Sequence, residues 1–216
     1  MDWYAPIVKH VVHPLWALKD GEMHLSILKD LERWQYLSPD DLARHQMERL
    51  RLLVRHAHAT CPYYRELFQA HGIEADNINS FEDFRKIPLL KKEDIQRHKD
   101  RMTSTQYRVD ELVPDKTGGS TGKPIHYFRD AFRRDMQKAA AMRHDRWARQ
   151  DIGDKIAVIW GHRGDLSGMK KLKSRIRNKV LDRLLILDAS SVTDEKLSGF
   201  IKDLERFRPA GYLGYA

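Results

Sequence analysis

Two short apolar runs constrain the fold of this chain more than any other feature: KIAVIW at 155–160 and LLILDAS at 184–190. Both faces of each run are apolar, which is typical of strands in a parallel sheet that is covered on both sides. A basic helix is expected between them, over 166–183, and an amphipathic helix capped by Thr193 leads to a third strand at 210–216. This alternation of strand and helix predicts a parallel sheet with right-handed crossovers.

The first half of the chain has a different character. Ser38 followed by Pro39 and Asp41 is the pattern of a helix N-terminus, and Ser80 with Asp83 repeats it. Apolar residues recur at helical spacing after Ser38, so short helices with polar faces are expected. We therefore expect a helical region over 1–104 and an α/β domain over 105–216.

The composition limits the classes of protein to which the chain can belong, but it does not identify a binding partner. The chain has 216 residues and a net charge of +8, which permits nucleotides, coenzyme A, nucleic acid or anionic lipid as acidic partners. Cys61 is the only cysteine, so the chain has no internal disulfide framework and fits a reducing cytoplasm. No apolar run reaches the ~18 residues of a transmembrane helix. The N-terminus lacks the pattern of a secretory signal.

The segment TGGSTGKP at 117–124 combines glycines, hydroxyls and a cation. It is not a nucleotide triphosphatase P-loop, because only three residues separate Gly118 from Gly122 and Pro124 follows Lys123. The next residues, IHYF at 125–128, are typical of a strand, so the loop lies between extended segments. Backbone N–H groups, hydroxyls and the lysine could hold an anion there. From these residues alone, a plain hairpin loop remains an equal alternative.

Four further segments stand in a fixed order around this loop: HAHATCPYYRELFQAHGI at 56–73, FEDFRKIPLLKKEDIQ at 81–96, GDKIAVIWG at 153–161 and FRPAGYLGY at 207–215. Together with TGGSTGKP they resemble the adenylate-forming superfamily, in particular its phenylacetate–coenzyme A ligase branch and that branch's members associated with capsular polysaccharide biosynthesis. The resemblance covers roughly residues 35–216. It implies an α/β fold in which a helical N-terminal region leads into the first part of the family's N-terminal domain, with a mixed or parallel sheet.

The resemblance also implies a reaction. A carboxylate attacks the α-phosphate of ATP, and the acyl-adenylate then passes to coenzyme A or another thiol, with ATP, Mg²⁺ and coenzyme A as cofactors. The loop would hold the β- and γ-phosphates through seven residues: Thr117, Gly118, Gly119, Ser120, Thr121, Gly122 and Lys123. The family's ribose-binding aspartate and catalytic lysine lie beyond the equivalent of Ala216. We therefore expect an N-terminal fragment without the C-terminal catalytic domain, inactive by itself.

Several other residues can be interpreted either as ordinary structural residues or as functional ones. His162, Tyr212 and Tyr215 are candidate substrate contacts, although each is also an ordinary surface or packing residue in such positions. His56 and His58 point to different faces of a helix, so we expect no metal site. An unpaired edge of the sheet would allow self-association. The alternative function is a non-catalytic, basic module that binds nucleotides or membrane surfaces, and no specific binding to nucleic acid is expected.

Overall fold

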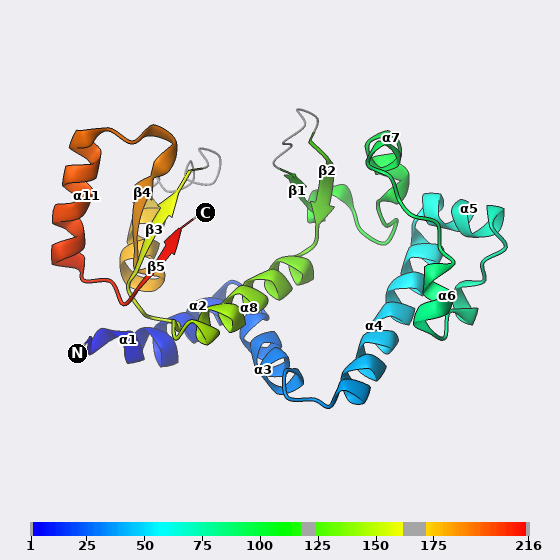
Figure 1. Cartoon of the computed structure of the whole chain (residues 1–216), viewed down its shortest axis with the longest axis horizontal. Coiled ribbons are helices and arrows are strands. Elements are labelled where there is room, and N and C mark those ends of the chain that lie inside the picture. Colours follow the sequence, from blue (N-terminus) through cyan, green and yellow to red (C-terminus); the bar gives the residue numbers. More distant parts are fainter. Residues whose placement is uncertain (1, 118–123, 162–171, 215–216) are drawn as a thin grey trace. The chain divides into compact units, whose positions relative to one another are not determined.

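The computed structural model describes residues 2–117, 124–161 and 172–214. The chain divides into two compact units, and each is described by itself (Figure 1). The first unit comprises residues 1–29 and 136–216, and the second comprises residues 30–135. The domain boundary expected after residue 104 stays a prediction.

The first unit contains a three-stranded parallel sheet. Its strands are β3 (Ile156–Trp160), β4 (Leu184–Asp188) and β5 (Gly211–Gly214), in the order β4-β3-β5 (Figure 1). Ile156 pairs with Leu184 on one side and with Gly211 on the other. The parallel sheet expected from the alternation of strands and helices is therefore confirmed.

Helical segments precede and separate the three strands of this sheet along the chain. They are the N-terminal α1 (Tyr4–Ile7), the π-helical turn η1 (Val8–Val12) and α2 (His13–Lys19); then α8 (Ala131–Trp147), whose residues from 136 onward belong to this unit, α10 (Leu172–Arg177), the π-helical turn η5 (Asn178–Asp182), the 3₁₀ turn η6 (Ala189–Ser191) and α11 (Asp194–Phe207). Thr193 caps α11 as expected, because its side chain accepts a hydrogen bond from the Lys196 N–H.

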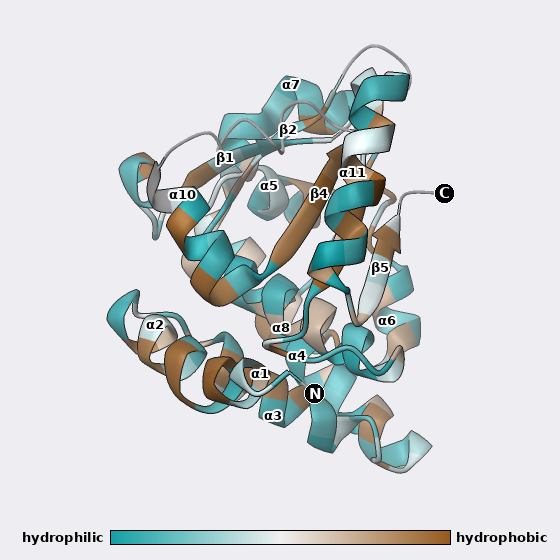
Figure 2. Cartoon of the chain, turned by 90° about the vertical axis from the view of Figure 1, so that its left-hand side faces the viewer, coloured by the Kyte–Doolittle hydropathy of each residue, from teal (hydrophilic) through white to brown (hydrophobic). Residues whose placement is uncertain are grey.

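The core of the first unit lies between the sheet and α11. Ala157, Leu187 and Phe200 are buried together there, with Leu185 and Leu204 packed against them. In Figure 2, β4 is brown along its length, whereas the outward side of α11 is largely teal. The spacing of apolar residues in α11 thus buries one stripe and leaves the charged stripe in water.

One arginine connects several segments of this unit. Arg183 has a left-handed backbone (φ 53°) and is only 7% exposed, and its guanidinium donates to the Gly153 carbonyl and the Asp2 carboxylate, both at 2.5 Å. The Arg183 guanidinium also lies over the Tyr4 ring, while the Tyr4 hydroxyl donates to the Val180 carbonyl. These contacts fix the first turn of the chain to the base of the sheet.

Gly153 is needed at this junction for two reasons. Its φ of +92° is a conformation that L side chains rarely adopt, and a Cβ there would collide with the Ala5 carbonyl. Lys9 adds an ion pair to Asp151 at 2.7 Å on the same side. The N-terminal helix therefore lies directly against the turn that precedes β3.

The prolines of the N-terminal segment do not end its helix. Residues 4–19, which include Pro6 and Pro14, are continuously helical, with a π turn in the middle. Pro14 is the second residue of α2 and comes directly after the π turn η1. Of the basic helix expected over 166–183, residues 172–182 are helical, as α10 followed directly by the π turn η5, and residues 166–171 lie outside the described part of the chain.

The second unit is mainly helical. Its elements are the C-terminal part of α3 (His24–Trp34), α4 (Pro39–Thr60), α5 (Pro62–Ala70), η2 (Ala75–Asn77), α6 (Phe81–Arg85), α7 (Lys92–Met102), η3 (Val109–Glu111), and the strands β1 (Val113–Lys116) and β2 (His126–Arg129). The sequence patterns correctly predicted the caps of α4 and α6. The Ser38 hydroxyl accepts from the Asp41 N–H, and Ser80 forms a complete capping box with Asp83.

The core of the second unit lies where α4, α5 and η2 meet. Val54, Phe68, Ala75 and Ile78 are buried together. Cys61 is also buried, in keeping with a packing role. Among the described residues, no helix is both long and apolar enough to cross a membrane.

We expect Arg183→Met to lower the free energy of unfolding by about 3 kcal/mol, because the Gly153 carbonyl and the Asp2 carboxylate lose their buried donor. Urea denaturation at pH 7 measures this loss. Arg206→Met removes the same charge from the exposed face of α11 and should change stability by less than about 0.5 kcal/mol. Equal losses in the two variants would contradict the role assigned to Arg183.

The ion pair between Arg183 and Asp2 also predicts that the free energy of unfolding depends on pH. Partial burial raises the pKa of Asp2, but the hydrogen bond and charge of Arg183 lower it by more, so the pKa in the folded protein is below its ordinary value. This contribution is present above the unfolded pKa and is lost as the pH falls through the folded one. Asp2→Asn should therefore be less stable than wild type at neutral pH, and the difference should shrink as the pH falls from about 5 to about 2. A constant difference would rule out this ionic contribution.

Candidate functional site

The glycine-rich segment lies at the turn of a two-stranded hairpin. Strands β1 and β2 are antiparallel, with Asp115 opposite Tyr127 and Lys116 opposite His126. The extended segments expected on both sides of the loop are therefore confirmed. Residues 118–123, which include six of the seven candidate phosphate-binding residues, lie outside the described part of the chain.

Two hydrogen bonds close the base of this loop. The Thr117 N–H donates to the Ile125 carbonyl at 2.9 Å, and the Ile125 N–H donates to Thr117 Oγ1 at 3.0 Å. On the outer side, Gln96 of α7 donates to the Pro124 carbonyl at 3.3 Å. The two ends of the loop are thus fixed to each other and to α7.

These contacts refine the role expected for Thr117. A threonine hydroxyl has one donor and two acceptor positions, and one acceptor position is occupied by the Ile125 N–H. The hydroxyl proton is not used in this bond, so it can be donated to an anion. The same Thr117 oxygen therefore accepts the hydrogen bond that closes the hairpin and carries a proton that it can donate to a ligand.

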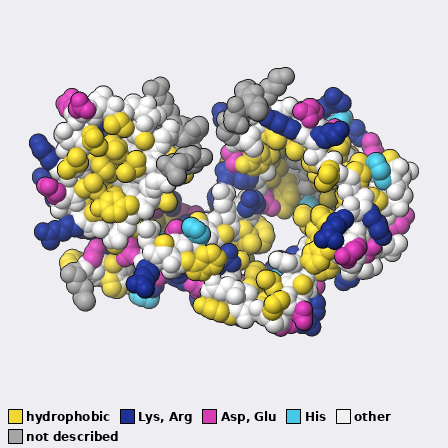
Figure 3. Space-filling view, viewed as in Figure 1, with side chains coloured by type: hydrophobic (Ala, Val, Ile, Leu, Met, Phe, Trp, Pro, Cys, Tyr) yellow, Lys and Arg dark blue, Asp and Glu magenta, His cyan; other side chains and the backbone are white. Residues whose placement is uncertain are grey.

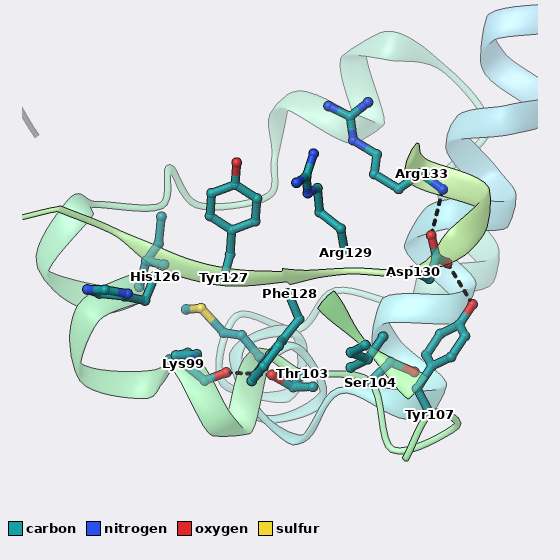
Figure 4. Close-up of a pocket in the computed structure, with 13 residues that line it drawn as sticks. Lys99, Thr103, Ser104, Tyr107, His126, Tyr127, Phe128, Arg129, Asp130 and Arg133 are labelled. Atoms are coloured by element: carbon teal, nitrogen blue, oxygen red, sulfur yellow. Dashed lines mark hydrogen bonds between the residues drawn. The ribbon is translucent and has the colours of Figure 1, made fainter. Parts of the chain in front are cut away.

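A network of charged side chains stabilises one face of the hairpin. Asp115 accepts from the Tyr127 hydroxyl at 2.7 Å and pairs with Arg129 at 3.1 Å. The Tyr127 bond, a bond from the Lys116 N–H and the Arg129 charge together hold the pKa of Asp115 below its ordinary value. The bond to Asp115 in turn raises the pKa of Tyr127. In Figure 4, Tyr127 and Arg129 point to the same side of β2.

A pocket of about 290 Å³ lies between β2, α7 and the first turn of α8 (Figure 4). Lys99 contributes a cation whose Nζ lies 4.2 Å from the centre of the Phe128 ring. At the far end, Asp130 accepts from the Tyr107 hydroxyl at 3.0 Å and from the Arg133 N–H at 2.6 Å, and the second bond caps α8. The bond to Asp130 raises the pKa of Tyr107.

The candidate substrate residues are only partly described. Tyr212 lies on β5, an outer strand of the described sheet, and its side chain is 63% exposed. His162 and Tyr215 lie outside the described residues. Figure 3 shows hydrophobic side chains gathered over the sheet and the sheet-facing side of α11. Within the described residues, no group of three or more His, Cys, Asp or Glu side chains is placed to hold a metal ion.

Reasoning from the sequence missed the pocket beside the hairpin. A signal for one wall was present, because Ile95, Lys99 and Met102 recur at i, i+4 and i+7, and all three line the pocket although α7 is kinked at His98. The opposite wall comes from β2 and the residues after it. No pattern within a single element indicates that these two walls meet.

Comparisons with known proteins agree with the sequence resemblance. No family model matches the chain. The phenylacetate–coenzyme A ligase of Aromatoleum evansii is 35% identical over 95 residues, which are 44% of this chain and 22% of that protein. The Pseudomonas putida enzyme of the same name is 31% identical over 144 residues, 61% of this chain and 30% of that protein.

The chain is a distant homologue of the phenylacetate–coenzyme A ligases. The chain is also 25% identical to Protein CapK of Staphylococcus aureus over 178 residues, 82% of the chain and 38% of that protein. It therefore spans about 22–38% of the length of these curated relatives.

Solved structures show that the fold is shared as well. An open conformation of 2-hydroxyisobutyryl-CoA ligase, in complex with 2-HIB-AMP and CoA, matches 82% of this chain and 41% of its own with a TM-score of 0.59. The same ligase in the thioesterification state, again with 2-HIB-AMP and CoA, gives 0.57. Sequence identity is 18% in both cases, so the likeness concerns the fold.

We expect Thr117→Val to loosen the base of the loop, because the Ile125 N–H loses its acceptor. Hydrogen exchange of the Ile125 amide, followed by NMR, should become about fivefold faster, since a net hydrogen bond contributes about 1 kcal/mol. Thr117→Ser keeps the oxygen and should exchange at nearly the wild-type rate. Equal protection in the valine and serine variants would show that this bond does not hold the loop closed.

Proposed function

We propose that this chain forms the N-terminal part of an ATP-dependent, adenylate-forming carboxylate ligase. In this proposal Thr117 to Lys123 hold the β- and γ-phosphates of ATP while a carboxylate attacks the α-phosphate. The acyl group then passes from the adenylate to coenzyme A or another thiol. The observation that carries the proposal is the closed hairpin base at Thr117 and Ile125, on which a segment of three glycines, three hydroxyls and one lysine is mounted.

The donor set of this segment suits a departing pyrophosphate. Negative charge grows on the pyrophosphate as the bond to the α-phosphate breaks, so fixed donors around it stabilise the transition state more than the ground state. Glycines let backbone N–H groups approach the phosphates closely, and Lys123 adds a point charge. The hairpin holds Thr117 and Ile125 together at the base of the segment, and fixed donors are favourable because they need not reorganise during the reaction.

The remaining components follow from the relatives. The solved ligase structures contain an acyl-adenylate and CoA, which supports ATP and coenzyme A as the cofactors of this protein. Mg²⁺ is included because divalent ions neutralise the phosphates in phosphoryl chemistry. A cytoplasmic location and a role in capsular polysaccharide biosynthesis are part of the same proposal. His162, Tyr212 and Tyr215 stay candidates for the acyl side of the site.

Nucleotide binding by the loop can be tested on the 216-residue chain. Lys123→Ala should weaken Mg-ATP binding about 10- to 100-fold, because a hydrogen bond to a charged group contributes about 1.5–3 kcal/mol. Isothermal titration calorimetry measures the affinity. Lys202→Ala removes an equal charge from the exposed surface of α11 and should bind ATP like wild type. Equal weakening in both variants would favour a merely basic surface, and unchanged binding in Lys123→Ala would remove the loop from the mechanism.

We further propose that residues 1–216 alone do not catalyse adenylation. The reaction requires the carboxylate to be held in line with the departing pyrophosphate, and the loop acts only on the pyrophosphate side. The purified chain, shown to be folded by circular dichroism, should give no ATP–pyrophosphate exchange with a panel of aryl and acyl carboxylates. Exchange above background that Lys123→Ala abolishes would overturn this part of the proposal.

A further inference from the structure

The N-terminal helix, residues 4–19 from α1 through η1 to α2, is apolar on two faces. One face is buried in the first unit: Val8, His13 and Ala17 are each at most 7% exposed. The outward face also carries large apolar side chains, which are 40–78% exposed: Trp3, Ile7, Val11, Leu15 and Leu18. A helix that is apolar on both faces is normally covered on both, so this outward face is a candidate contact surface.

The five outward side chains follow one line along the helix. Successive members are four, four, four and three residues apart, the spacing of neighbours on one helix face. The π turn η1 supports this alignment, because its i→i+5 bonds widen the turn and keep side chains four apart closer to one line. In Figure 2 the ribbon of α1 and α2 is brown over much of its length. We call these five residues the outward stripe.

Basic residues lie beside the C-terminal end of the outward stripe. The Lys19 ammonium lies 5.2 Å from the centre of the Trp16 ring. The Arg177 guanidinium lies 5.7 Å from the same ring, which places α10 beside α2. The helix therefore has the basic crossover helix as its neighbour.

The charges around the outward stripe add up to a positive surplus. Arg175 and Lys179 of α10 and η5 are exposed, as is Lys19. Among the described residues, none of these three forms an ion pair with a carboxylate. On the acidic side, Asp2 is paired with Arg183, and Asp20 offsets one of the three cations. Apolar side chains bordered by excess cations match the surface of an anionic bilayer.

The size of the outward face favours a lipid surface over a second copy of the chain. A helix of this length is about 24 Å long and about 10 Å wide, so its face presents roughly 250 Å². Each partner in a stable protein interface contributes about 800 Å². A bilayer has no such requirement, because a single amphipathic helix can lie in the plane of its interface.

We propose that the N-terminal helix lies on the surface of an anionic lipid bilayer and attaches the protein there as a peripheral contact. The outward stripe enters the boundary between headgroups and acyl chains, a depth that suits the amphipathic ring of Trp3. Lys19 and the exposed cations of α10 and η5 pair with lipid phosphates. The helix precedes residues 35–216, which carry the ligase resemblance, so this proposal does not depend on nucleotide binding by residues 117–123.

Sedimentation of the 216-residue protein with vesicles tests the proposal. The probe is phosphatidylcholine vesicles that contain about 30% phosphatidylserine, compared with vesicles of phosphatidylcholine alone. We expect binding to the anionic vesicles to be at least about tenfold stronger. Most of this difference should disappear at about 1 M salt, where the Debye length falls to about 3 Å.

A matched pair of variants decides where the lipid binds. Leu15→Gln should weaken binding to the anionic vesicles about tenfold, because an apolar side chain is lost from the bilayer. Leu53→Gln on α4 changes a leucine of nearly equal exposure, 62% against 61%, and should bind like wild type. Lys19→Gln should weaken binding to the anionic vesicles about fivefold and leave binding to phosphatidylcholine unchanged.

The outcomes that contradict the proposal are distinct. Absence of vesicle binding, equal losses in Leu15→Gln and Leu53→Gln, or wild-type binding in Leu15→Gln would overturn it. A lipid-free dimer, detected by analytical ultracentrifugation and lost in Leu15→Gln, would make the face an interface between copies and would also overturn it. Lys123→Ala should bind vesicles like wild type, so failure of the nucleotide proposal and failure of this one are distinguishable.

Discussion

The buried guanidinium of Arg183 organises the first unit, because it satisfies groups from segments far apart in the sequence. It binds the Asp2 carboxylate, the Gly153 carbonyl and the Tyr4 ring. Its own backbone continues the pattern: the Arg183 N–H donates to the Asn178 carbonyl, and its carbonyl accepts from the Ile156 N–H. A buried cation without these partners would be costly, so the first turn of the chain and the start of the sheet are held in one arrangement.

The junction between η5 and β4 is held by side-chain hydrogen bonds next to Arg183. Asn178 forms two hydrogen bonds with the backbone of Leu184, one to its N–H and one to its carbonyl, both at 2.8 Å. The Asn178 side chain thus pairs both backbone groups of Leu184, the first residue of β4, while Arg183 adopts a left-handed conformation. The chain therefore turns from η5 into β4 within a single residue, without a glycine.

Local features were predictable from the sequence, and features that join distant segments were not. The caps at Ser38, Ser80 and Thr193 depend on residues three positions apart, and the strands β3 and β4 follow from their own apolar runs. By contrast, neither the contacts of Arg183 nor the pocket beside β2 has a signature within one element, because each requires side chains brought together by the fold. The glycine-rich segment was recognised by composition and resemblance, yet the bond that Thr117 makes to Ile125 is visible only in the hairpin.

The hydrogen bonds at the base of that hairpin come from residues outside 118–123, the inner part of the segment that is proposed to bind phosphate. The bonds between Thr117 and Ile125, together with the pairing of β1 and β2, involve only residues on either side of 118–123. These contacts fix the two strands against each other from outside that stretch, so a substitution within 118–123 leaves each of these hydrogen bonds with both of its partners in the sequence.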